Sequence, residues 1–300
     1  MVSSTYAPDA LTSLRESFAL HLDATRAAKT TRIYLDALDN LIAHLAGQGM
    51  PLTAGGVRRE HIESYLAMRK ATVAPSTLSL EYRALVQFWK WCEDEDEVER
   101  SPMVKMKQPT VPDSPVPIVS PDDFRKLLKT VAGKDFTSRR DMAVLLTLYD
   151  TGIRAGELIG LTLEDVDLRM RLATVTGKGS RVRAVRFGAQ TAVALDRYLR
   201  LRRGHRFADA EWLWLGQRGR LEYSALAVML AKRSDQAGLS RIHAHQFRHS
   251  FAHEYLLNGG LEGDLQRLAG WKSTIMLRRY GASGADERAR KAYTSPADRL

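Results

Sequence analysis

The sequence predicts a mainly α-helical protein of two domains, with a small antiparallel β-sheet in the second domain. Three observations lead to this prediction. Apolar residues recur at three- and four-residue spacing in every long segment before residue 109, as they do on one face of a helix. A stretch with six prolines between residues 102 and 121 then interrupts the chain. Beyond it, two short alternating segments flank GKGS, which is typical of a β-hairpin.

The first domain, residues 1–108, is predicted to be a compact bundle of four helices. Glycines 47 and 49 offer a stop after the second helix, and Ser76 before Thr77 offers an N-cap to the fourth. Residues 109–120 are predicted to form an extended linker, because proline has a fixed φ and no backbone donor. The helical periodicity covers residues 9–22, 30–49, 58–70 and 76–92.

The second domain, residues 121–284, combines helices with the hairpin. LATVTG at 172–177 and RVRAVRF at 181–187 alternate apolar and polar residues around the glycine-containing turn. Residues 285–300 form a tail in which Ala285, Ala289 and Ala292 would share one face of a short helix. The helical segments of this domain are predicted at residues 120–131, 139–152, 191–203, 224–236, 245–258 and 264–270.

Composition excludes several classes of protein. The chain of 300 residues is 44% hydrophobic and 27% charged, which is ordinary for a globular protein and not for a disordered or fibrous one. It has no apolar run of 18 residues and no apolar signal core near its start, so we expect neither a membrane span nor secretion. Its single cysteine, Cys92, cannot form an internal disulfide and fits the reducing cytoplasm.

The charge is distributed unevenly. The chain carries a formal net charge of +10. Residues 1–112 hold 13 basic and 14 acidic side chains, whereas the remainder holds 32 and 21, an excess of 11 positive charges. This excess favours a polyanionic partner for the second domain.

Polar residues interrupt the apolar pattern of the second domain. Arg154, in YDTGIRAGEL, must meet an anion or a carboxylate, and an internal ion pair with Glu157 or Asp150 is the simpler interpretation. In HAHQFRHSFAHEYLL, His245, His249 and His253 lie four residues apart, as ligands of one metal ion on a helix could. No HExxH motif and no paired-cysteine spacing accompanies them, so a metal site is not favoured. His245 and Arg248, three residues apart, can instead present donors to one phosphate.

Three further residues are ambiguous when taken singly. Lys178 lies at the hairpin tip and by itself is best interpreted as a solvated turn lysine. A phosphate-binding P-loop is rejected there, because Leu172 and Gly179 stand where that motif needs glycine and Ser or Thr. Tyr280 and Trp271 would each pass as core aromatic residues. Together, however, these residues could form a metal-free and cofactor-free site for phosphoryl transfer, with a nucleophile, fixed cations and an acid.

The ordered set of motifs resembles the tyrosine recombinase (phage integrase) family. The resemblance rests on TGIRAGEL, the hairpin lysine, HQFRHSFA, and GW followed nine residues later by tyrosine, over about 140 residues. Two positions depart from the usual pattern: Trp271 replaces a histidine, for which tryptophan is a known alternative, and Phe247 replaces a leucine.

The resemblance implies a role for each matched residue. Arg154 and Arg248 would bind the scissile phosphate, and Glu157 would support the site. Trp271 would donate through its indole N–H, and His245 would accept a proton or donate a hydrogen bond. Lys178 would protonate the leaving 5′ oxygen, and Tyr280 would attack to give a 3′-phosphotyrosyl bond, with neither metal nor ATP.

The resemblance also implies a fold and partners. The two domains would close as a clamp on duplex DNA, and a homotetramer would form in the synaptic complex, with an accessory DNA-bending protein as a further expected partner. The tail would dock on a neighbouring protomer. Contacts of the first domain with DNA are expected from Lys29, Thr31, Arg32, Ser76 and Arg83.

These features predict a site-specific recombinase. The motif LAGWKSTIMLRRYGAS favours an integrase of a mobile element over an Xer-type chromosome or plasmid resolvase, which usually has GHSS there. A type IB topoisomerase and a non-catalytic DNA-binding regulator are the alternatives. Covalent trapping on nicked DNA separates the regulator from the enzymes, and four-protomer synapsis separates the two enzymes.

Overall fold

The computed structural model describes residues 10–112, 117–177 and 181–271, together with residues 289, 290, 293, 295 and 297. The chain forms two compact units, Met1–Ser114 and Pro115–Leu300, and each unit has its own hydrophobic core. None of the helices in the described ranges is both long enough and apolar enough to cross a membrane.

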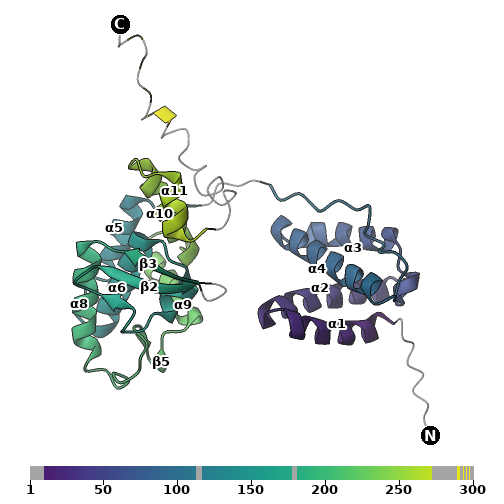
Figure 1. The fold of residues 1–300 in the computed structure, drawn as a ribbon, viewed down its shortest axis with the longest axis horizontal. Coiled ribbons are helices and arrows are strands. Elements are labelled where there is room, and N and C mark those ends of the chain that lie inside the picture. The colour runs from purple at the N-terminus through teal and green to yellow at the C-terminus, as the bar shows by residue number, and fades with distance from the viewer. Residues whose placement is uncertain are drawn as a thin grey trace. The chain divides into compact units, whose positions relative to one another are not determined.

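The first unit is the helical bundle that the periodicity predicted (Figure 1). Helix α2 packs against the other three helices, and Leu38 and Leu41 of α2 are fully buried in the core with Phe88 and Trp89 of α4. The helices are α1 (Leu11–Thr25), α2 (Ala28–Gly47), α3 (Arg59–Thr72) and α4 (Pro75–Asp94), with a 3-10 turn, η1 (Ala54–Gly56), between α2 and α3.

The start of α4 differs from the prediction. The helix begins at Pro75 and its N-cap is Ala74, so Ser76 lies inside the first turn and the N-cap prediction is wrong. Proline has the helical φ already and needs no backbone partner at the first position, which makes this earlier start favourable. The chain after α4 packs back onto it: the Tyr82 hydroxyl donates to the Met106 carbonyl at 2.8 Å.

The second unit is also mainly helical, and the predicted hairpin is confirmed. Strands β1, β2 and β3 form an antiparallel sheet in that order, with Leu172 opposite Arg186 and Gly177 opposite Arg181. The short elements α7, β1, β4 and β5 were not predicted, because none is long enough to show periodicity. The elements are α5 (Pro121–Lys129), α6 (Phe136–Thr151), α7 (Ala155–Gly160), β1 (Val166–Asp167), β2 (Leu172–Gly177), β3 (Arg181–Arg186), α8 (Ala189–Arg202), β4 (Leu215–Gly216), β5 (Gly219–Arg220), α9 (Tyr223–Gln236), α10 (Ala244–Leu257) and α11 (Glu262–Ala269).

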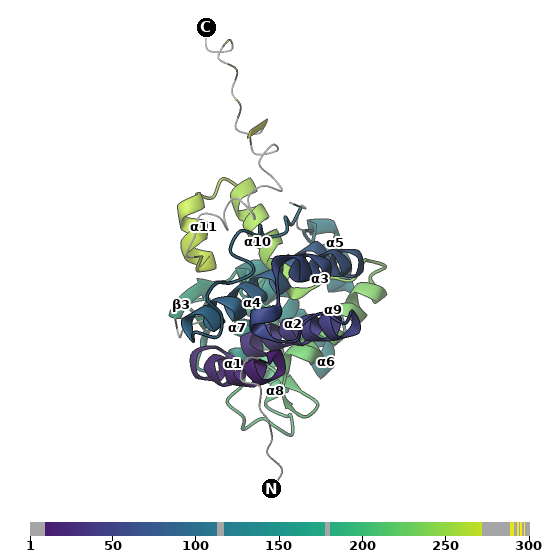
Figure 2. The same cartoon turned by 90° about the vertical axis from the view of Figure 1, so that its right-hand side faces the viewer.

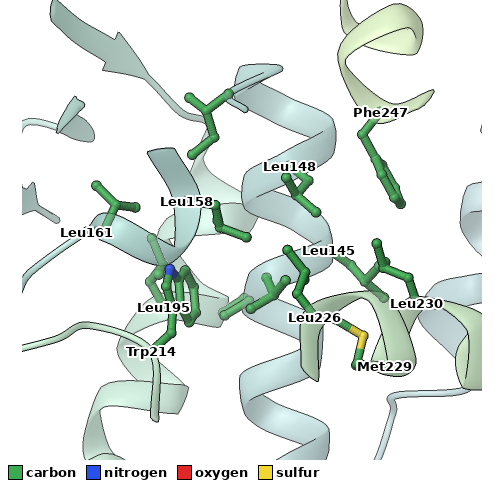
Figure 3. Packing of buried hydrophobic residues seen from close by; sticks show 14 of the residues in the cluster. Leu145, Leu148, Leu158, Leu161, Leu195, Trp214, Leu226, Met229, Leu230 and Phe247 are labelled. Atoms are coloured by element: carbon green, nitrogen blue, oxygen red, sulfur yellow. The ribbon is translucent and has the colours of Figure 1, made fainter. Parts of the chain in front are cut away.

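Helix α6 runs through the core of the second unit. Figure 3 shows Leu145 and Leu148 of α6 among Leu158 of α7, Leu226 of α9 and Phe247 of α10. All five side chains are buried. This packing sets the position of α7 and α10, which carry most of the candidate site residues.

A smaller apolar cluster joins α10 to α11. The two helices lie side by side in both views of the molecule (Figures 1 and 2). Ala252 and Leu256 of α10 meet Leu265 and Ala269 of α11, and Trp271 belongs to the same cluster. The end of α11 is therefore held against the helix that carries Arg248.

Candidate active site

A tight turn between α6 and α7 presents Arg154. Gly152 ends α6 with φ +58°, and a Cβ built there would lie 2.5 Å from Cδ1 of Phe251. Both the left-handed backbone and the close approach of the ring therefore require glycine. The chain turns at once into α7, with Arg154 as its N-cap residue.

Glu157 is the partner of Arg154, of the two carboxylates considered from the sequence. The Arg154 backbone N–H donates to Oε2 of Glu157 and Nη1 donates to Oε1, each at 2.8 Å. The other candidate, Asp150, accepts bonds from the Gly188 backbone N–H and the Thr191 hydroxyl. The Arg154 side chain remains 43% exposed although Glu157 is only 3% exposed, so the guanidinium is held at one side and open to solvent at the other.

Arg183 of β3 is a member of this cluster that the sequence did not indicate. Its Nη1 and Nη2 donate to Oε1 and Oε2 of Glu157, at 2.8 and 2.9 Å. Its Nε donates to the backbone carbonyl of Leu268, at the end of α11, at 3.1 Å. In RVRAVRF, alternation places Arg183 on the same strand face as Arg181, and nothing local distinguishes the half-buried arginine from the exposed one.

Arg248 links three parts of the second unit. It is 1% exposed, and its Nη1 donates to the carbonyl of Gly152 at 2.8 Å, two residues before Arg154. Its Nη2 donates to the carbonyl of Ala269. Its Cζ lies 5.4 Å from the ring centroid of Trp271, within the range of a cation–π contact. The structure thus brings Arg248, Trp271 and the turn before Arg154 together.

The histidines of α10 differ in exposure. His245 is exposed, and its ring lies edge-on to that of buried His249, with centroids 4.8 Å apart. His253 is also buried. In the part of the chain that the structure describes, no three His, Cys, Asp or Glu side chains gather as a metal site would require.

Two of the predicted site residues, Lys178 and Tyr280, lie outside the described residues. Strand β2, which leads to Lys178, nevertheless ends beside Glu157, the carboxylate that Arg154 and Arg183 share. A Cβ built on Gly177 would lie 3.2 Å from Oε1 of Glu157. The end of β2 nearest the hairpin tip therefore packs closely on the carboxylate that holds Arg154.

The residues expected to contact DNA from the first unit fall into two groups. Lys29 and Arg32 on α2, and Ser76 and Arg83 on α4, are exposed. Thr31 is only 6% exposed, because it shares the buried face of α2 with Leu38, seven residues further on. Thr31 is therefore not available as a DNA contact, and its expected contact is wrong.

The arginines keep Glu157 charged. Burial alone would raise the pKa of its carboxyl, but hydrogen bonds from Arg183 and Arg154, together with the charge of Arg183, outweigh burial and hold that pKa at about 2. Glu157 is therefore a fixed anion at neutral pH. It can orient arginines, but it cannot exchange protons in a reaction there.

Comparison with known proteins agrees with this architecture. The model of the phage integrase family matches residues 118–287. Tyrosine recombinase XerC of Myxococcus xanthus is 31% identical over 281 residues, which cover 90% of this chain and 93% of that protein. Two solved structures share the fold at 17% identity. The first is XerH recombinase in a post-cleavage complex with its difH substrate; the alignment covers 94% of this chain and 84% of the XerH chain, with a TM-score of 0.74. The second is the Tn1549 transposon integrase with transposon end DNA; the alignment covers 94% of this chain and 99% of the integrase chain, with a TM-score of 0.72.

The fold and the match over most of the chain define a DNA strand-transferring enzyme of the tyrosine recombinase class. The chain belongs to the phage integrase family.

Replacement of Glu157 by glutamine is expected to make stability less dependent on pH. The folded-state pKa lies below the ordinary value of 4.5, so the charged carboxylate contributes stability above about pH 4.5. This contribution, about 3 kcal/mol from the pKa difference, is lost as the pH falls toward about 2. Urea denaturation of both proteins between pH 7 and pH 2 should show the stability difference shrinking below pH 4.5. A difference that stays constant over this range would contradict the account.

Proposed function

We propose that this chain is a site-specific DNA recombinase that cuts and rejoins duplex DNA through a 3′-phosphotyrosyl intermediate. One observation carries the proposal beyond family membership. Buried Arg248 bonds to the carbonyl of Gly152, two residues before Arg154, so two arginines distant in sequence are tied to one turn. Arg154 is open to a phosphate, whereas Arg248 would exchange one of its carbonyl bonds for the phosphate as negative charge grows there during the reaction.

Each matched residue then has one task. Arg154 and Arg248 bind the non-bridging oxygens of the scissile phosphate, and Glu157 orients Arg154. Trp271, packed beside Arg248, donates through its indole N–H. His245, exposed at the start of α10, accepts a proton or donates a hydrogen bond. These tasks position the phosphate and compensate charge, and they require no proton transfer from Glu157.

The chemical step exchanges one phosphodiester for another. The phenol of Tyr280 gives its proton to His245 as its oxygen forms a bond to phosphorus, and the bond from phosphorus to the 5′ oxygen breaks. Lys178 gives its proton to that oxygen, which leaves as a hydroxyl. The phosphotyrosyl bond retains the energy of the original linkage, so a 5′ hydroxyl from another strand can reverse the step without ATP or a metal.

The first unit would add contacts to DNA. Helices α2 and α4 begin without side-chain caps, so the N–H groups of their first turns can meet phosphates. Lys29 and Arg32 on α2, and Ser76 and Arg83 on α4, are the proposed contacts. In this proposal residues 1–108 form the core-binding domain, 109–120 a linker across the DNA backbone, and 121–284 the catalytic domain that completes a clamp.

Recombination would take place in a homotetramer on cytoplasmic DNA, with an accessory DNA-bending protein. The tail, residues 285–300, would dock on the neighbouring protomer through the face of Ala285, Ala289 and Ala292. A chain ended at Gly284 should then bind its site but form less synaptic complex on a native gel. If the shortened chain forms as much synaptic complex as the full chain, the tail does not dock on a neighbouring protomer.

Two biological roles are supported by different observations. The motif around Trp271 favours an integrase of a mobile element. An Xer-type resolvase is the second candidate, supported by the XerC relative from Myxococcus xanthus, which this chain matches over nearly its full length. Sequencing the DNA trapped covalently on the protein in cells would decide. Junctions of a mobile element support the first role, and a single chromosomal or plasmid site supports the second.

Tyr280→Phe is expected to bind the target site normally and to form no covalent adduct, because only the phenolic oxygen is lost. A nicked duplex that traps the intermediate, followed by a denaturing gel, makes the measurement. A persisting covalent band would move the nucleophile elsewhere, with exposed Tyr293 as the nearest alternative.

Lys178→Ala is expected to cleave ordinary DNA slowly and to recover on DNA with a 5′-bridging phosphorothioate. A positioned acid contributes roughly 10²–10⁴-fold, and sulfur leaves without needing a proton. Arg154→Ala is the matched control and should recover much less, since the charge that it stabilises develops with either leaving atom. If Lys178→Ala is equally slow on both substrates, the lysine does not protonate the leaving oxygen and acts only through its charge.

A further inference from the structure

Arg183 is the least expected member of the charged cluster in the second unit. Its side chain is 16% exposed, and all three of its nitrogens donate to acceptors within the protein. Two of them form a fork on the carboxylate of Glu157, which is the geometry that restrains a carboxylate in both position and rotation. The hydrogen bonds of the Arg183 guanidinium are therefore directed to groups of the protein itself, whereas Arg154 is half-exposed to solvent.

The carboxylate that Arg183 holds is the same one that orients Arg154. Each oxygen of Glu157 accepts one bond from Arg183 and one from Arg154. If the fork were lost, only the two bonds from Arg154 itself would restrain the carboxylate. The direction of the Arg154 guanidinium then depends on Arg183, although the two arginines do not share a bond.

Arg183 also fixes the end of α11. Its Nε bonds to the carbonyl of Leu268, and the next carbonyl, that of Ala269, accepts from Arg248. A Cβ on Gly270 would lie 3.2 Å from Cδ of Arg183, so the backbone packs directly on this side chain. The chain continues from here to Trp271 and, nine residues later, to Tyr280.

We propose that Arg183 is a positioning residue for strand cleavage, which acts through Glu157 on Arg154 and sets the start of the segment that carries Tyr280. The inference rests on the proposed function, since it assigns these residues to the same reaction. Arg183 does not bind the phosphate itself. It joins β3, α7 and α11 at one point, so Arg154 and the backbone from Leu268 to Gly270 are held together.

The test is a double-mutant cycle on the rate of covalent adduct formation, measured in a single turnover at saturating nicked DNA. Arg183→Gln should slow the step by about 10²-fold, as a small misplacement of reacting groups does. Glu157→Gln should slow it similarly, and the double variant should be no slower than the worse single variant, because both changes remove one linkage. DNA affinity should change much less than this rate.

Two further variants separate positioning from folding. Arg183→Lys keeps the charge but cannot form the fork, so it should fold normally and recover only part of the rate. Arg186→Gln, which removes an exposed arginine from the same strand, should cleave like the unsubstituted chain. All rates are compared well below the melting temperature of each variant.

The outcomes distinguish this role from the proposed function. If the unsubstituted chain forms the adduct and Arg183→Gln forms it as fast, the positioning role is overturned and the recombinase proposal stands. Multiplicative effects in the double variant would likewise show that Arg183 does not act through Glu157. If the unsubstituted chain forms no adduct, the proposed function fails and the role of Arg183 fails with it.

Discussion

A buried carboxylate that is shared by two arginines organises the second unit. Glu157 is almost fully enclosed, and a carboxylate in that setting is strongly unfavourable unless it is paired. Arg154 comes from the start of the same helix, whereas Arg183 comes from the sheet. Their convergence on Glu157 connects α7 to β3, and the bond from Arg183 to the Leu268 carbonyl extends the connection to α11.

Not all of the positive charge of the second unit is available to bind a polyanion. From the sequence, the excess of basic residues beyond residue 112 predicts an electrostatic surface for a polyanion. In the structure, several of these arginines are buried and bind the protein itself. Arg202 donates to four backbone carbonyls, including those of Ala208 and Trp212, and Arg233 forms an ion pair with buried Asp141. Net charge therefore overstates the number of arginines that can reach a phosphate.

Much of the fold could be predicted because its signals are local. Helical periodicity located the long helices, and alternation around GKGS located the hairpin. The Arg154–Glu157 pair was foreseen as one of two choices, since both residues lie in a single helical turn. Arg183 was not foreseen, because its partners lie 26 and 85 residues away and its burial depends on how α11 ends.

The other differences also have tertiary or backbone causes. Ser76 lost the predicted N-cap position because Pro75 starts α4 earlier, and Thr31 is buried because α2 turns that face toward the bundle. The catalytic assignments follow from the ordered motifs. The geometry adds the connection between Arg248 and the turn that precedes Arg154, which no local pattern could have indicated.

We expect Arg154 and Arg248 to bind one phosphate while Glu157 and Arg183 hold Arg154 in place. A crystal structure of the Tyr280→Phe chain on its uncleaved target DNA tests it most directly. Both guanidinium groups should lie within hydrogen-bond distance of the same scissile phosphate, and the bonds from Arg183 and Arg154 to Glu157 should be retained. A phosphate bound away from Arg154 and Arg248, or a Glu157 released from Arg183 in the complex, would contradict it.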